Sequence, residues 1–233
     1  MNTKKLLIIF ILSFVVGFIS FVNIYSQDDT KVALVKKIVK DVTYKKAGVS
    51  DWDVAKSGVP LKDGEQVKTG AKSLALILFT DGSGLLTVKE NAILNIYGKK
   101  EGKSLNKNTD IAKGMIGFKV NKQSGNEEFK FTTPTAVASI RGTAGFLNVD
   151  DNNTLFFLES GSAEIETRIG TRRNGRVEAG NSARIDAQGD LTIYPSTEEE
   201  KRLNEQTRNL STKKVIIKTN RGIVEIEYFT SGN

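Results

Sequence analysis

Short strand-like segments separated by glycine-containing turns fill most of this 233-residue chain. Phe129-Lys130-Phe131-Thr132 alternates apolar and polar residues, as a strand with one buried face does. Leu74 to Thr80 is almost entirely apolar, which indicates a strand buried on both faces. Asp81-Gly82-Ser83-Gly84 then favours a hairpin turn, because Asp-Gly suits positive φ. We therefore predict an all-β fold, a single compact sandwich or roll of mostly antiparallel short strands.

Two residue types that carry much of enzyme chemistry are missing from the sequence. Without cysteine there is no disulfide, thiol nucleophile or cysteine-ligated metal site. Without histidine the commonest general base and the commonest metal ligand are lost as well. We therefore predict that the protein is not an enzyme and needs no cofactor or metal.

The positive charge of the chain indicates the kind of partner. The net charge of +7 suits contact with anionic polymers or phosphates of a cell envelope. Aromatic residues do not alternate with the arginines as they do in single-stranded nucleic-acid platforms. We expect an envelope protein or an anionic envelope polymer as partner, and no nucleic acid.

Residues 1–26 have the pattern of a secretory signal peptide, with cleavage predicted near Ser26. Lys4-Lys5 precede an apolar run from Leu6 to Val22. The alternative is an uncleaved anchor, because this run is about 25 Å long as a helix, the short limit for spanning a membrane. Either way we expect a periplasmic or secreted protein that contacts the membrane only through this segment, if it is retained.

The character of the sequence changes at Pro195. We predict a β domain over residues 30–194 and a C-terminal extension over residues 195–233. The extension opens with a short helix, whose start is predicted from a capping box of Ser196 and Glu199. This helix has few apolar residues, so weak packing is expected.

A β-hairpin is predicted at the C-terminus, from Lys214–Lys218 and Ile223–Phe229. Because an isolated hairpin is marginal in water, we expect it to dock on the main sheet or to mediate association.

Two polar stretches are predicted to lie outside the strands. Gly98 to Asn108 is rich in lysine and glycine and is expected to be an exposed loop. Trp52, the only tryptophan, lies in a polar connection. We expect its ring to cover the edge of the core, with ligand stacking as the alternative.

Four arginines make the most basic segment, Arg168, Arg172, Arg173 and Arg176, around Asn174-Gly175, a type I′ turn signal. Guanidinium groups bind phosphate and carboxylate with paired donors. These arginines are the candidate partner-binding site, and a hairpin tip without a ligand is the alternative.

Two carboxylates offer a different chemistry. Glu164 and Glu166 are predicted to share one face of a strand. A pair of carboxylates is what glycoside hydrolysis requires. A solvated polar face is the more ordinary interpretation.

A structural role is predicted for the segment that follows Phe131. Pro134 ends a strand because it has no N–H, and Gly142 allows a turn into the next strand. Arg141 lies among small and apolar residues. A buried arginine needs a partner, so we expect it to be partly buried and paired with Glu159.

Several of these elements together resemble the FecR-type periplasmic domain of bacterial cell-surface signalling proteins, over Val32 to Ile193. The matching residues are Val67-Lys68-Thr69-Gly70, Leu76 to Phe79 before Asp81-Gly82-Ser83, Phe118-Lys119-Val120, Phe129 to Pro134, Arg141-Gly142-Thr143 with Phe146, Leu158 to Ile165 with Glu159 and Gly161, and Val177 to Asn181. The resemblance implies a compact all-β domain outside the inner membrane, without catalytic residues. Signalling members also carry a cytoplasmic segment that acts on a sigma factor, for which Met1 to Lys5 are too short.

The function predicted from the sequence is an exported, non-catalytic FecR-like binding module of the cell envelope, with a role in cell-surface signalling. Two alternatives stay open: an envelope glycan hydrolase that uses the paired carboxylates, and an extracellular structural or adhesive β-protein.

Overall fold

The computed structural model describes residues 31–230 except 103, 123–126, 151–152, 209–210 and 221. The signal peptide or anchor predicted for residues 1–26 lies outside the described residues. In the part of the chain that is described, no helix has the length and apolar character needed to cross a membrane.

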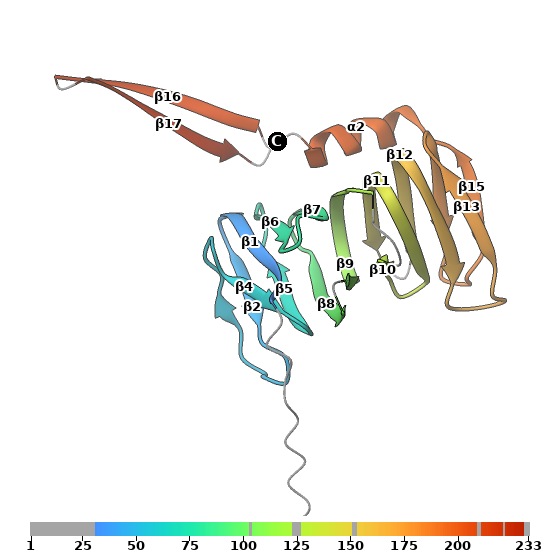
Figure 1. Ribbon diagram of the computed structural model, residues 1–233. Helices are drawn as coiled ribbons and strands as arrows, with labels where there is room; N and C mark the ends of the chain where they lie inside the picture. Colours follow the sequence, from blue (N-terminus) through green and yellow to red (C-terminus); the bar gives the residue numbers. More distant parts are fainter. Residues whose placement is uncertain are drawn as a thin grey trace, which may run out of the picture.

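Fifteen strands form one large sheet and two form a separate hairpin (Figure 1). All strand pairs are antiparallel except β9 with β10, which confirms the predicted mostly antiparallel all-β class. The strands of the large sheet are β1 (Lys31–Val39), β2 (Val42–Lys45), β3 (Asp53–Val54), β4 (Pro60–Lys62), β5 (Glu65–Thr69), β6 (Leu74–Phe79), β7 (Gly84–Val88), β8 (Ile93–Glu101), β9 (Ser104–Val120), β10 (Phe129–Thr132), β11 (Ala136–Asp150), β12 (Asn153–Thr167), β13 (Asn174–Glu178), β14 (Asn181–Ile185) and β15 (Leu191–Pro195).

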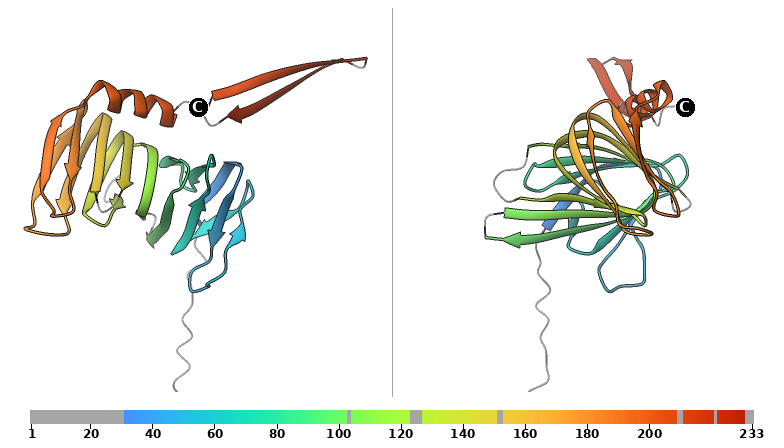
Figure 2. Two further views of the ribbon diagram at one scale, coloured as in Figure 1. Left: turned by 180° about the vertical axis from the view of Figure 1, so that it is seen from behind. Right: turned by 90° about the vertical axis from the view of Figure 1, so that its right-hand side faces the viewer.

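Three long strands, β9, β11 and β12, fold this sheet into two layers. One half of each strand pairs within a first layer, with β15, β14, β7, β6, β1 and β4. The other half pairs within a second layer, with β13, β10, β8, β5, β2 and β3. The end-on view in Figure 2 shows the strands facing one another across the core. These long bent strands differ from the short strands expected, because each one serves both layers.

Strands β11 and β12 turn from one layer to the other at neighbouring glycines. Gly142 has a φ of 63° and Gly161 a φ of 79°, a region that side chains with a Cβ disfavour. A Cβ on Gly161 would lie 2.4 Å from the carbonyl oxygen of Gly142. Next to them, the buried Thr143 hydroxyl donates a hydrogen bond to the Ser162 carbonyl at 3.1 Å. The two strands therefore cross the corner in close backbone contact.

The core between the layers is built by the inward residues of alternating strands. Phe79 packs edge-to-face on Phe129 with ring centroids 4.8 Å apart, and Phe118 lies 4.8 Å from Phe131. Phe129 and Phe131 are buried at both inward positions of β10, as their alternation predicts. Burial of such rings contributes the largest share of the free energy of folding.

One lysine is buried in this core and pairs with a partly exposed carboxylate. The predicted loop at Gly98 to Asn108 is instead a hairpin, in which β8 and β9 pair from Glu101 and Ser104 onward. Lys107 of β9 points inward with a side chain that is 0% exposed, and its ammonium lies 2.5 Å from the Asp81 carboxylate. Because Asp81 belongs to the β6–β7 turn, the pair links the second layer to the first.

The helix α2 (Glu198–Arg208) lies across the outside of the first layer (Figure 1). Its capping box is one residue later than predicted: the Thr197 hydroxyl accepts from the Glu200 N–H, and the Glu200 carboxylate accepts from the Thr197 N–H. The Glu200 carboxylate also accepts hydrogen bonds from the hydroxyls of Ser182 and Tyr194. The helix therefore attaches through polar contacts rather than through the few apolar side chains considered from sequence.

Two phenylalanines lie beneath this helix. Phe146 of β11 and Phe157 of β12 are paired in register and stack with centroids 5.3 Å apart. Both are buried although they alternate with the core residues Leu147 and Phe156, so they face away from the space between the layers. Since α2 contacts both strands, the helix shields this stack from solvent.

The C-terminal hairpin, β16 (Ser211–Thr219) and β17 (Gly222–Thr230), is present as predicted but does not dock on the main sheet. It forms its own two-stranded sheet and projects away from the other strands (Figure 1). Its aliphatic residues Val215, Ile216, Ile217 and Ile223 are exposed. The expected docking on the main sheet is therefore wrong, and association through the hairpin remains a prediction.

The corner contact leads to a first prediction. Gly161→Ala should lower the free energy of unfolding more than Gly180→Ala, a control with a φ of 82° but no neighbour within 4 Å of the added Cβ. Both changes cost about 1–2 kcal/mol for the left-handed backbone, and overpacking adds about 1–3 kcal/mol at Gly161. Chemical denaturation measures both, and equal losses would contradict the corner contact.

The ion pair of the buried Lys107 leads to a second prediction. Asp81→Asn leaves the Lys107 ammonium buried without its counter-charge and should cost about 3–5 kcal/mol of unfolding free energy. The double variant Asp81→Asn/Lys107→Met should recover most of this loss, since it removes the buried charge as well. Chemical denaturation measures the stability of both variants. If the double variant is no more stable than Asp81→Asn alone, the unpaired Lys107 charge is not the cause of the lost stability.

The same pair predicts how stability depends on pH. Burial raises the pKa of Asp81, but hydrogen bonds from Lys107 and the Ser83 backbone together with the Lys107 charge outweigh it, so the pKa is lowered. A carboxyl with a lowered pKa in the folded state stabilises above its unfolded pKa of about 3.9 and loses that contribution on acidification. The stability difference between the wild type and Asp81→Asn should therefore shrink below about pH 4.

Candidate binding surface

The outward residues of the second layer form one continuous face, opposite the core. Strand side chains alternate, so the burial of Lys107 and Thr109 places Asn108 and Asp110 on the outside. We call this surface the outer face; its members include Thr43, Lys45, Gln66, Lys68, Asn95, Tyr97, Asn108, Asp110, Lys130, Thr132, Ser139, Glu164, Glu166, Asn174 and Arg176.

Strand register orders the outer face into rows. One row crosses six strands as Arg176, Glu164, Ser139, Lys130, Asn108 and Tyr97. The next crosses eight strands as Asn174, Glu166, Val137, Thr132, Asp110, Asn95, Gln66 and Lys45. The outer face is thus a long polar surface with charged ends.

Hydrogen bonds between neighbouring strands hold the middle of the outer face. The Gln66 amide donates to the Asn95 side-chain oxygen at 2.7 Å, and the Thr132 hydroxyl donates to that of Asn108 at 2.9 Å. Asp110 is half-buried between them; burial raises its pKa, and the positive charge of Arg168 opposes this only in part. The polar groups of this region are therefore positioned by the sheet itself.

The four predicted arginines lie at the β12–β13 end and all have partners. Arg176 bonds Glu164 at 3.2 Å and Glu178 at 2.5 Å. Arg168 donates to the Thr133 carbonyl at 2.7 Å, and Arg173 pairs with Asp190 at 3.1 Å. Arg172 is 4.0 Å from Glu166 and its side chain is 81% exposed. Arg172 is thus the arginine of this group most open to a ligand.

The turn predicted at Asn174-Gly175 is wrong. Both residues lie within β13, paired with Glu166 and Ile165, and the turn comes earlier, where Gly170 has a φ of 64°. A Cβ on Gly175 would lie 2.8 Å from side-chain atoms of Leu191 and Ile193. The glycine therefore serves close packing of β15 and not chain reversal.

Glu164 and Glu166 lie on the open outer face, two positions apart on β12. Each faces an arginine, Glu164 at 3.2 Å from Arg176 and Glu166 at 4.0 Å from Arg172. Side chains of both glutamates are more than half exposed. The two carboxylates therefore belong to a solvent-exposed row of ion pairs.

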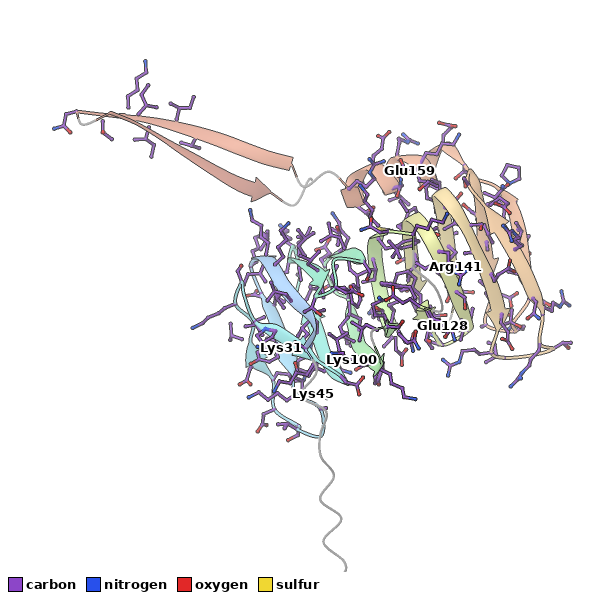
Figure 3. The ribbon with its side chains drawn as sticks, in the orientation of Figure 1. Lys31, Lys45, Lys100, Glu128, Arg141 and Glu159 are labelled. Atoms are coloured by element: carbon purple, nitrogen blue, oxygen red, sulfur yellow. The ribbon has the colours of Figure 1, made fainter. Side chains whose placement is uncertain are left out.

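Arg141 departs from its predicted environment. It is exposed rather than partly buried, and Glu159 forms its ion pair with Arg208 of α2. Figure 3 shows Glu159 next to α2 and Arg141 lower down, on the side of Glu128. The expected ion pair between Arg141 and Glu159 is therefore not formed. The register partner of Arg141 is Ser162, and β12 turns its corner between Glu159 and Ser162.

A groove of about 340 Å³ lies at this end of the outer face. It brings together Arg141, Glu128, Glu164 and Arg176, which are far apart in sequence. Pro134 lies elsewhere, in the β10–β11 turn, where Thr133 and Ala136 exchange hydrogen bonds. Of the residues named from sequence, the structure thus gathers Arg141, Glu164 and Arg176 around one concave surface.

Sequence reasoning missed the polar row and the position of Trp52. The alternation Leu105, Lys107, Thr109, Ile111 was a usable signal, since it assigns Asn108 and Asp110 to the opposite face. Trp52 is 37% exposed, and the ammonium groups of Lys45 and Lys68 lie 5.1 and 5.7 Å from the centre of its ring. Its approach to these lysines depends on chain folding and left no signal in the sequence.

Comparison with known proteins gives a similar fold and a family match for part of the chain. Two crystal structures, at 2.50 and 1.65 Å, of a "putative anti-sigma factor" from Parabacteroides distasonis ATCC 8503 resemble this chain with a TM-score of 0.51 each. They are 12% and 11% identical to it, and the similarity covers 66% of this chain and 68% of theirs. No curated protein matches the sequence. The model of the family described as FecR protein matches residues 65–164, from β5 into β12.

Proposed function

We propose that the protein is an exported, non-catalytic binding module of the bacterial cell envelope that acts in cell-surface signalling. The observation that carries the proposal is the outer face, a polar surface whose row from Arg176 to Tyr97 crosses six strands. Such an open surface suits recognition of an extended or large partner. The match to the FecR family model and the similarity of fold to a protein described as an anti-sigma factor support the signalling role.

The arginine end of the outer face is the proposed contact with an envelope protein or an anionic envelope polymer. Arg172 and Arg173 extend at its margin with side chains more than half exposed. Exchange of a weak surface ion pair for a carboxylate or phosphate of the partner costs little, because exposed pairs contribute only about 0–1 kcal/mol. The neighbouring groove, which Arg141 lines, offers a concave surface that a protruding group of the partner could enter.

Glycan hydrolysis through Glu164 and Glu166 is supported less well. A catalytic acid needs a raised pKa, which enclosed or apolar surroundings supply. These two side chains are instead more than half exposed and paired with arginines. Their arrangement suits a contact surface better than an acid and nucleophile pair.

Location and division of the chain are part of the proposal. Cleavage near Ser26 would release the protein into the periplasm or beyond. Residues 30–194 would then form the β domain, and residues 195–233 an extension whose helix covers the first layer.

A binding assay tests the arginine contact. Immobilised wild type and the Arg172→Ala/Arg173→Ala variant are compared for recovery of partners from an envelope extract, with Lys36→Ala/Lys119→Ala as a control of equal charge change. Lys36 and Lys119 are exposed on strands of the first layer. We expect about tenfold weaker retention for the arginine variant, equivalent to about 1.4 kcal/mol, and unchanged retention for the control.

Equal retention by all three proteins would remove the arginines from the proposed site. If the wild type instead degrades an envelope glycan and Glu164→Gln abolishes the turnover, the proposal of a binding module is wrong and the alternative of a glycan hydrolase is right.

A further inference from the structure

Trp52 lies on the outer face at the end far from the arginines. It precedes β3, which pairs with β2, and its ring is flanked by Lys45 of β2 and Lys68 of β5. Both lysines are outward residues of the second layer, opposite Gln66 and Thr43 in register. The indole of Trp52 thus lies at the polar surface, with the ammonium groups of Lys45 and Lys68 next to its ring.

Among the described residues, the two ammonium groups beside this ring have no carboxylate as a direct ion-pair partner, although Asp51 and Asp53 flank Trp52 in the sequence. Lys46, which follows Lys45, pairs with Asp53 at 3.6 Å. Contact with the ring stabilises each ammonium group only weakly. Two like charges held beside one ring repel each other, so an anion placed between them would be favoured.

Neutral hydrogen-bonding groups lie beside the indole on the same surface. The Gln66 side-chain N–H donates to the Asn95 oxygen, which leaves the Gln66 oxygen and the Asn95 amide N–H groups for a ligand. Gln66 is the register partner of both Lys45 and Asn95. Hydroxyl groups of a bound molecule would find both a donor and an acceptor here.

We propose that Trp52, Lys45 and Lys68 form a binding site for an anionic glycan. One sugar ring stacks with its C–H groups on the indole, its carboxylate or phosphate lies between the two ammonium groups, and its hydroxyls bond the Gln66–Asn95 pair. The proposal rests on the proposed function only in using the outer face, since it places this ligand at the end opposite the arginines.

Tryptophan fluorescence tests the site directly, because Trp52 is the only tryptophan of the chain. The full exported chain is titrated with oligogalacturonate, which carries carboxylates, with dextran phosphate, which carries phosphates on the same sugar backbone as the control, and with neutral dextran. We expect a saturable change with at least one anionic polymer and none with dextran. The arm that responds identifies the anion.

Two double variants that keep Trp52 separate specific binding from net charge. Lys45→Gln/Lys68→Gln should raise Kd about tenfold, because both positive charges that would contact the anion are lost. Lys36→Gln/Lys119→Gln, with the same charge change on the first layer, should leave Kd within about twofold. Arg172→Ala/Arg173→Ala should also leave the titration unchanged.

Three outcomes would overturn the inference: no response to either anionic polymer, an equal response to dextran, or an equal loss in the Lys36/Lys119 control. If the titration fails while the arginine variant still loses its envelope partner, the inference fails and the proposed function stands.

Discussion

The corner at which β11 and β12 pass from one layer to the other determines which of their side chains face inward in each layer. Gly142 and Gly161 approach so closely there that no side chain fits between them. Side chains of a strand alternate between faces, and a slip of one residue would exchange inside and outside. The corner therefore fixes which residues of these two strands form the core and which lie outside it.

Charges are distributed in two different ways on the structure that results. The buried Lys107 pairs with the partly exposed Asp81 and links the layers, and Arg176 is held in a row of surface ion pairs. Lys45 and Lys68, in contrast, have an aromatic ring as their neighbour. Charge that the fold has already paired contributes to stability or orientation. Charge that it has left unpaired is the better candidate for ligand binding.

Local patterns predicted the parts of this fold that depend on local physics. Alternation identified β10, a continuous apolar run identified the buried β6, and Asp-Gly identified the turn after it. The helix start was misplaced by one residue because Ser196 and Thr197 both precede a glutamate at capping distance. In that case local sequence offers two equivalent solutions, and contacts of Glu200 with β14 and β15 select one.

Features that depend on distant contacts were not predictable in this way. A lysine in a charged, glycine-containing stretch indicates a loop, yet Lys107 is buried because a turn some 25 residues earlier supplies Asp81. Glu159 meets Arg208 only because α2 folds back over the first layer. The outer face likewise combines side chains from eight strands, so no single segment contains its signal.

Site-specific photo-crosslinking in cells can show whether partners bind the outer face of the second layer. A photoreactive residue replaces either Lys130, on the outer face, or Lys119, on the outside of the first layer. We expect adducts with envelope components from position 130 and none from position 119. Adducts from position 119 alone, or from neither position, would contradict binding at the outer face.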